Sequence, residues 1–137
     1  MDVNKPSLNE AEQSRLVECA LQAREEAYAP YSGFLVGAAE LTNSGEVLRG
    51  CNVENASYGL TICAERVAVT TAVAAGHRDF QAIAIASTGG VVPCGACRQF
   101  LAEFEPDLAI LLVDSESRSI ELRNLVELLP YPFGRRG

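Results

Sequence analysis

The chain has little of what several common functional sites are made of. Its 137 residues include one histidine and no tryptophan. A single histidine cannot build the histidine-rich zinc sites of many metalloenzymes. The longest apolar runs, such as 82–86 and 108–113, have the length of a strand and are too short to cross a bilayer. Residues 1–6 lack the apolar stretch of a secretory signal, so we expect a cytoplasmic protein without a membrane partner.

Excess positive charge is also missing. The formal net charge is −7, and no basic run occurs before Arg135 and Arg136. A surface of this kind repels the phosphate backbone of DNA and RNA. The composition therefore argues against a nucleic-acid partner.

Cysteine is present in an odd number, five. In a chain that looks intracellular, this argues against a disulfide framework. Three of the cysteines lie in two short stretches, Thr-Ile-Cys-Ala-Glu-Arg at 61–66 and Pro-Cys-Gly-Ala-Cys-Arg at 93–98. Each stretch is typical of the first turn of a helix, and this clustering favours a metal site.

The remaining pattern predicts a single domain over residues 1–137. Ser7 and Glu10 fit a capping box at the start of the first helix, Pro30 follows its end, and Gly76 is placed to stop the second helix. Helices are expected at 8–28, 62–75, 94–104 and 123–129, and strands at 35–41, 47–53, 80–86, 108–113 and 119–122. The last two strands are joined by too few residues for a crossover helix and should pair antiparallel. This order predicts an α/β fold in which a mixed sheet lies between layers of helices.

The three clustered thiols could share one zinc ion. Cys94 and Cys97 are three positions apart and lie on one face of a helix, while Cys63 begins another helix. Three thiolates leave a tetrahedral zinc with one open position, as a catalytic site requires, and two helix N-termini would lower the pKa values of the thiols. Glu65, two residues after Cys63, is suited to carry protons for a water molecule in that position.

Two arginines follow the cysteine motifs. Three thiolates on Zn²⁺ leave a net negative charge that weakens the metal as a Lewis acid. Arg66 and Arg98 could each donate a hydrogen bond to sulfur and restore part of that acidity.

Two other interpretations of these motifs stay open from the residues alone. A lone Cys-x-x-Cys in a cytosolic protein can be a thioredoxin-like redox pair. A structural zinc site would be closed by a fourth ligand, and Glu65 could be that ligand. The activity that remains in Glu65→Ala separates a catalytic from a structural Glu65.

Six segments together resemble the small homotetrameric type of cytidine deaminase. They are Ala-Pro-Tyr-Ser-Gly-Phe at 29–34, Val-Gly-Ala-Ala at 36–39, Gly-Cys-Asn-Val-Glu-Asn at 50–55, Cys-Ala-Glu-Arg at 63–66, Pro-Cys-Gly-Ala-Cys-Arg-Gln at 93–99 and Glu-Leu-Leu-Pro at 127–130. The resemblance implies a three-layer α-β-α sandwich with a five-stranded mixed sheet, a zinc cofactor and a homotetramer. It also implies hydrolytic deamination of cytidine and 2'-deoxycytidine, in which Glu65 moves protons and zinc-bound hydroxide attacks C4 of the base.

The resemblance also suggests how a nucleoside is held. Asn52 and Glu54 alternate at a strand end, so an amide and a carboxylate point the same way and can bind ribose hydroxyls, where Glu54 would repel a phosphate. The family assigns both to ribose binding, although the spacing alone also fits two polar residues in solvent. Phe34 corresponds to a wall of the base pocket, although a lone aromatic residue there is more often part of a core.

Three further contacts are implied in the same way. The N–H of Ala64 is suited to bind the base carbonyl, and the carbonyl of Pro93 to accept from the exocyclic amine. Phe133 resembles an aromatic residue that a neighbouring subunit contributes to the pocket. Two alternatives remain: a blasticidin S deaminase-like enzyme, which shares the cysteine motifs and the chemistry, and a non-enzymatic zinc or redox module.

Overall fold

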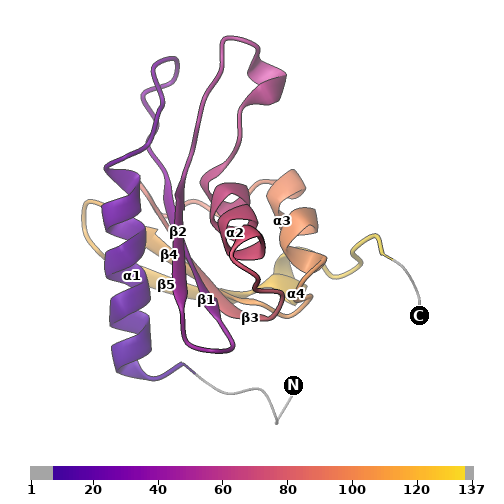
Figure 1. Cartoon of the computed structure of the whole chain (residues 1–137). Helices are drawn as coiled ribbons and strands as arrows, with labels where there is room; N and C mark the ends of the chain where they lie inside the picture. Colours follow the sequence, from indigo (N-terminus) through magenta and orange to yellow (C-terminus); the bar gives the residue numbers. More distant parts are fainter. Residues whose placement is uncertain (1–7, 135–137) are drawn as a thin grey trace.

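The computed structural model describes residues 8–134 and contains a five-stranded sheet with the strand order β2-β1-β3-β4-β5 (Figure 1). Residues 1–6 and Ser7, on which two of the predictions rest, lie outside the described part. The strands are β1 (Gly37–Thr42), β2 (Val47–Cys51), β3 (Phe80–Ser87), β4 (Ala109–Asp114) and β5 (Ile120–Asn124). The helices are α1 (Glu10–Arg24), α2 (Ala64–Ala74), α3 (Gly95–Ala102) and α4 (Leu125–Leu128), with a 3-10 turn η1 at Tyr58–Leu60.

The sheet is mixed, as the sequence predicts. Strand β1 pairs antiparallel with both β2 and β3, and β4 pairs antiparallel with β5. Only β3 and β4 among these pairs run parallel, and helix α3 lies on the connection between them. The short segment after β4 therefore returns the chain antiparallel, as its length requires.

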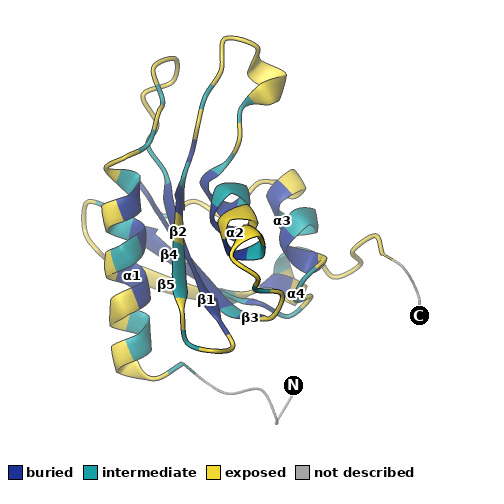
Figure 2. Cartoon of the chain, viewed as in Figure 1, coloured by how far each residue is buried: buried dark blue, intermediate teal, exposed yellow. Residues whose placement is uncertain are grey.

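Helices cover both faces of the sheet (Figure 1). Helix α1 packs on one face over a core that includes Leu16, Ala39 and Leu111. Helices α2 and α3 pack on the other face over a second core, which includes Ala68 and Ile83. The buried residues accordingly form two layers, one on each side of the strands, while the loops at one end of the sheet are largely exposed (Figure 2). The α-β-α sandwich is confirmed.

Two glycines allow the helices to approach the sheet closely. A Cβ atom at Gly37 would lie 2.1 Å from the carbonyl oxygen of Ala20 in α1. At Gly50 it would lie 2.3 Å from the backbone nitrogen of Ala68 and 2.7 Å from the carbonyl oxygen of Ala64, both in α2. Real Cβ atoms do not occupy such positions, so glycine at residue 50 sets how close the first turns of α2 lie to β2.

The start of α1 differs from the prediction. Its N-cap is Asn9, whose Oδ1 accepts from Glu12 N at 2.8 Å, while Glu12 Oε1 accepts from Asn9 N at 3.1 Å. The capping box predicted for Ser7 and Glu10 is therefore wrong by two positions. Asparagine caps as well as serine does, and a glutamate also stands three residues after Asn9, so the sequence offers two equivalent registers.

The end of α1 also differs, because the helix stops at Arg24 and not near residue 28. Tyr28 uses its backbone elsewhere: its N–H donates to Asn52 O at 3.0 Å, and its carbonyl accepts from Glu54 N at 2.8 Å. These bonds to a distant strand end replace the helical ones. Helix α2, in contrast, stops where expected, since Gly76 has φ +98° and donates to Val73 O.

None of the helices in the described part of the chain is both long and apolar enough to span a membrane.

Candidate active site

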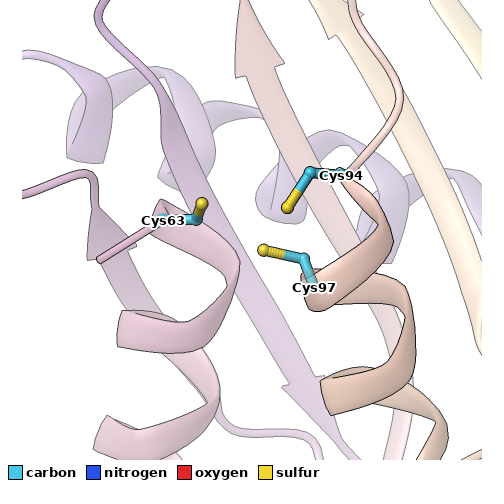
Figure 3. Close-up of side chains that lie close together, drawn as sticks. All are labelled: Cys63, Cys94 and Cys97. Atoms are coloured by element: carbon cyan, nitrogen blue, oxygen red, sulfur yellow. The ribbon is translucent and has the colours of Figure 1, made fainter. Parts of the chain in front are cut away.

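Three sulfur atoms converge where the first turns of α2 and α3 meet. Cys63 is the N-cap of α2, Cys94 is the N-cap of α3, and Cys97 lies in the first turn of α3. Their Sγ atoms all lie within 4.8 Å of one another, between the first turns of the two helices (Figure 3). Sulfurs that share a tetrahedral zinc stand roughly 3.8 Å apart, as follows from a Zn–S distance of about 2.3 Å. The trio therefore fits a zinc ion with only small adjustments.

The electrostatics of the trio favour a thiolate. A hydrogen bond from the Cys97 thiol and the neighbouring guanidinium of Arg66 lower the pKa of Cys63 to about 5. The pKa of Cys97 is raised, because its thiol donates to Cys63 and is buried. Zinc binds cysteine as the thiolate, and the lowered pKa of Cys63 favours that form. The donor set thus fits zinc in chemistry as well as in geometry.

The two arginines have different contacts. Arg66 Nη2 lies 3.6 Å from Cys63 Sγ, which agrees with the expected hydrogen bond to sulfur. Arg98 instead donates to main-chain carbonyls, from Nε to Pro93 O at 2.8 Å and from Nη1 to Leu128 O at 3.3 Å. This differs from the sulfur contact that the sequence suggests. Arg98 therefore ties the residue before Cys94 to the end of α4.

Glu65 is the second residue of α2, and its side chain is buried, with 5% of the residue exposed. It lines a cavity of about 220 Å³ together with Cys63 and Cys94. Burial raises the pKa of the Glu65 carboxyl, and the negative charge of Cys63 adds to this effect. The carboxyl therefore holds a proton more firmly than a surface glutamate does, which is the direction a proton carrier needs.

The cavity combines apolar walls with a few polar groups, a lining that suits a flat polar heterocycle. Its lining residues are Phe34, Val36, Asn52, Thr61, Cys63, Ala64, Glu65, Ile85, Val91, Val92 and Cys94. The ring of Phe34 is not part of a core, since 39% of the residue is exposed. Ile85, Val91 and Val92 are lining residues that sequence analysis does not single out, because an apolar residue in a strand or loop carries no chemical signature.

Asn52 and Glu54 lie in adjacent cavities. Asn52 is buried, accepting from Val36 N at 3.0 Å and donating to Phe34 O at 2.9 Å, so it is not a solvated polar residue. Glu54 lies in a neighbouring cavity of about 350 Å³, which it lines with Tyr31, Ser32, Asn55, Tyr58 and Thr61. Thr61 lines both cavities, so the two spaces adjoin.

The other predicted contacts are placed as follows. Ala64, fully buried, begins α2 and lines the cavity of Glu65. Pro93 precedes α3, and its carbonyl accepts from Arg98 as described above. Phe133 lies outside this cavity, with 89% of the residue exposed, although Gln99 holds its main chain through Phe133 N to Gln99 Oε1 at 3.0 Å and Gln99 Nε2 to Phe133 O at 2.7 Å.

Comparisons with known proteins agree with this geometry. The family described as "Cytidine and deoxycytidylate deaminase zinc-binding region" matches residues 10–112. A cytidine deaminase of Halalkalibacterium halodurans is 49% identical over 120 residues, covering 86% of this chain and 91% of the relative. The crystal structure of cytidine deaminase from Burkholderia pseudomallei superposes with a TM-score of 0.85 at 47% identity, covering 92% of this chain and 100% of that one.

A different deaminase is more distant. Blasticidin-S deaminase of Bacillus cereus is 30% identical over 110 residues, covering 73% of this chain and 77% of the relative. The three cysteines that sequence analysis assigns to zinc all lie inside the matched zinc-binding region and converge in space. The family match, the relatives and the thiol trio agree, and the chain belongs to the zinc-dependent cytidine deaminase family.

Proposed function

We propose that the chain catalyses the hydrolytic deamination of cytidine and 2'-deoxycytidine to uridine and 2'-deoxyuridine, with release of ammonia. One observation carries this proposal: the buried carboxyl of Glu65 lines the same cavity as Cys63 and Cys94. A similar protein, 49% identical, is named a cytidine deaminase, which supports the choice of substrate.

The residues divide the chemistry between them. Zinc held by Cys63, Cys94 and Cys97 would supply a Lewis acid with one open position, which makes water acidic. Glu65 accepts a proton from the attacking water and delivers it to N3 of the base. It then carries the second proton of that water to the exocyclic amine, as the C4–N bond breaks and the C4=O bond forms. Both water protons are accounted for, one on N3 and one on ammonia.

The chain's other groups hold the nucleoside. The Phe34 ring forms a wall for the base, and the N–H of Ala64 at the start of α2 donates to the base carbonyl. The Pro93 carbonyl has a second lone pair beyond its bond from Arg98, and accepts from the amine. Asn52 and Glu54 bind the ribose, and the negative charge of Glu54 disfavours a 5'-phosphate.

A homotetramer is part of the proposal. The side chain of Phe133 is almost fully exposed, and its main chain is fastened to Gln99, so the ring is presented outward. Tyr58 and Leu60 beside the second cavity are also exposed, at 78% and 64%. Large apolar side chains presented in this way suit a subunit interface in which Phe133 completes the cavity of a neighbour. Sedimentation of the purified chain measures the state directly, and a monomer at micromolar concentration overturns this part.

Cytoplasmic location stays a prediction. All five cysteines are unpaired, as expected in a reducing compartment.

A substrate panel tests the activity. The purified, zinc-loaded chain is assayed for ammonia release from cytidine, 2'-deoxycytidine, cytidine 5'-monophosphate, cytosine and blasticidin S. We expect turnover of both nucleosides and much weaker turnover of the monophosphate. No ammonia from cytidine overturns the proposal, and a preference for blasticidin S supports the alternative that the more distant relative suggests.

A further inference from the structure

Glu54 is fastened to a turn that precedes it by more than twenty residues. Its Oε1 accepts from Tyr31 N at 2.9 Å and from Ser32 N at 3.1 Å, and its Oε2 accepts from Ser32 Oγ at 2.5 Å. The Ser32 hydroxyl, with the N–H groups of Ser32 and Tyr31, lowers the pKa of the Glu54 carboxyl. The carboxylate is therefore kept ionised and in one orientation, with one acceptor position of Oε2 left over.

The Ser32 hydroxyl also binds the residue that carries the base-pocket ring. Its Oγ accepts from Phe34 N at 3.0 Å. Because this N–H occupies a lone pair of the oxygen, the hydroxyl proton is directed toward Glu54. Gly33, with φ +70°, lets the chain turn between the two residues. One hydroxyl thus links the backbone of Phe34 in one cavity to the carboxylate of Glu54 in the next.

Asn52 grips the same segment from the same strand end. Its amide binds Val36 N and Phe34 O, as described above. Asn52 and Glu54 therefore hold the 31–36 segment together: Glu54 binds its start at Tyr31 and Ser32, and Asn52 binds the backbone of Phe34 and Val36. An unanchored glutamate on a partly exposed loop would lose rotamer freedom when a ligand binds, which weakens binding.

We propose that Ser32 is a positioning residue. It fixes the Glu54 carboxylate at a set position relative to Phe34, so that the sugar and the base of one nucleoside can be bound at the same time. The inference rests on the proposed role of Glu54 in binding ribose. Ser32 acts on the binding of the nucleoside and not on proton transfer, because its contacts lie with Glu54 and Phe34 and not with Glu65 or the thiols.

Steady-state kinetics on cytidine test this role. For Ser32→Ala we expect KM to rise roughly tenfold, near the lower end of the effect of one hydrogen bond to a charged group. We expect kcat to stay within about twofold, since the loss falls on ground-state and transition-state binding alike. Ser32→Thr keeps a hydroxyl at this exposed position, so its KM should stay near the wild-type value. Ser14→Ala, at an exposed serine of α1, is the matched control.

A double-mutant cycle identifies the route. In a Glu54→Ala background, Ser32→Ala should change KM no further, because its partner is gone. An equal rise of KM in both backgrounds overturns the inference, since the hydroxyl would then act only through the Phe34 N–H. A wild-type KM in Ser32→Ala, with a raised KM in Glu54→Ala, also overturns it but leaves the ribose role of Glu54 intact. Active enzyme with an unchanged KM in Glu54→Ala removes that ribose role instead. Thermal midpoints confirm that each variant folds.

Discussion

Glu40 offers a sharp test of the energetics of the fold. It lies in the middle of β1 with 0% exposed, and its register partners are Leu48 in β2 and Ile83 in β3. Strand alternation places it with Ala38 on the face that α2 covers. Within the described part of the chain, neither of its carboxyl oxygens has a hydrogen-bond partner. Burial without a partner raises the pKa of Glu40 well above its ordinary value of 4.5.

Two terms determine what replacing Glu40 does to stability. A neutral carboxyl buried without a partner costs roughly 1–3 kcal/mol, and Glu40→Leu removes that cost at every pH. The second term depends on pH, because the folded chain binds the Glu40 proton more tightly than the unfolded chain does. This tighter proton binding adds to the free energy of unfolding, and the added stability is fully present below about pH 4.5. It then falls by about 1.4 kcal/mol for each pH unit as the pH rises toward the raised pKa of the folded state.

Urea unfolding of the zinc-loaded protein between pH 5 and pH 8 measures both terms. We expect the wild type to lose stability relative to Glu40→Gln as pH rises, because the isosteric amide does not titrate while all other titrating groups are shared. Glu40→Leu should be the most stable of the three variants. In a separate thermal melt, each kcal/mol gained should raise the melting temperature by about 3 °C in a chain of this size. Glu18→Gln, at a surface ion pair with Arg118, is the control that should change little.

Parallel pH profiles for the wild type and Glu40→Gln would refute the reasoning. They would mean that Glu40 ionises in the folded protein as freely as in the unfolded chain.

Three further predictions concern the active site. Glu65→Gln should keep the fold and the zinc content but lower kcat on cytidine by roughly 10²- to 10⁴-fold. Metal analysis of the same sample checks the zinc content. Wild-type turnover in the zinc-loaded variant would exclude the proton-carrier role. Arg66→Gln removes the donor 3.6 Å from Cys63 Sγ and should weaken zinc binding about 10- to 100-fold in a chelator competition, and an unchanged affinity would contradict this role. Gly50→Ala should cost about 1–3 kcal/mol in urea unfolding and lower zinc content, because its Cβ would lie 2.3 Å from Ala68 N. Gly59→Ala, where a Cβ meets nothing within 4 Å, should leave stability unchanged, and equal losses in both variants would argue against the packing explanation.

Much of this architecture is predictable because it follows from local patterns. Apolar runs separated by turn residues predict the five strands, and a connection of five residues allows only an antiparallel return between β4 and β5. The thiol trio is predictable for a related reason. Cys63 and Cys94 each begin a helix, and two such motifs in one small chain have few uses other than a shared metal.

What the sequence does not predict depends on partners that are distant along the chain. The early end of α1 follows from bonds between Tyr28 and the strand end at residues 52–54, and no local pattern signals them. Arg98 looks equivalent to Arg66 in sequence, yet the loop before α3 and the carbonyl of Leu128 take its hydrogen bonds. Glu40 stands among small apolar residues, and nothing local distinguishes a buried carboxylate there from one at the surface.

Long-range contacts of strand β2 position both parts of the candidate site. The close packing of α2 on Gly50 sets the position of its first turn, and that turn carries Glu65 and follows Cys63. The chain just beyond Gly50 carries Asn52 and Glu54, which hold the segment bearing Phe34. Strand β2 thus positions the Glu65 carboxyl through α2, and it positions Asn52 and Glu54, which we propose bind the nucleoside, through its own end. A shift of this strand should therefore disturb proton transfer and substrate binding together, whereas changes in the 31–34 turn should disturb binding alone.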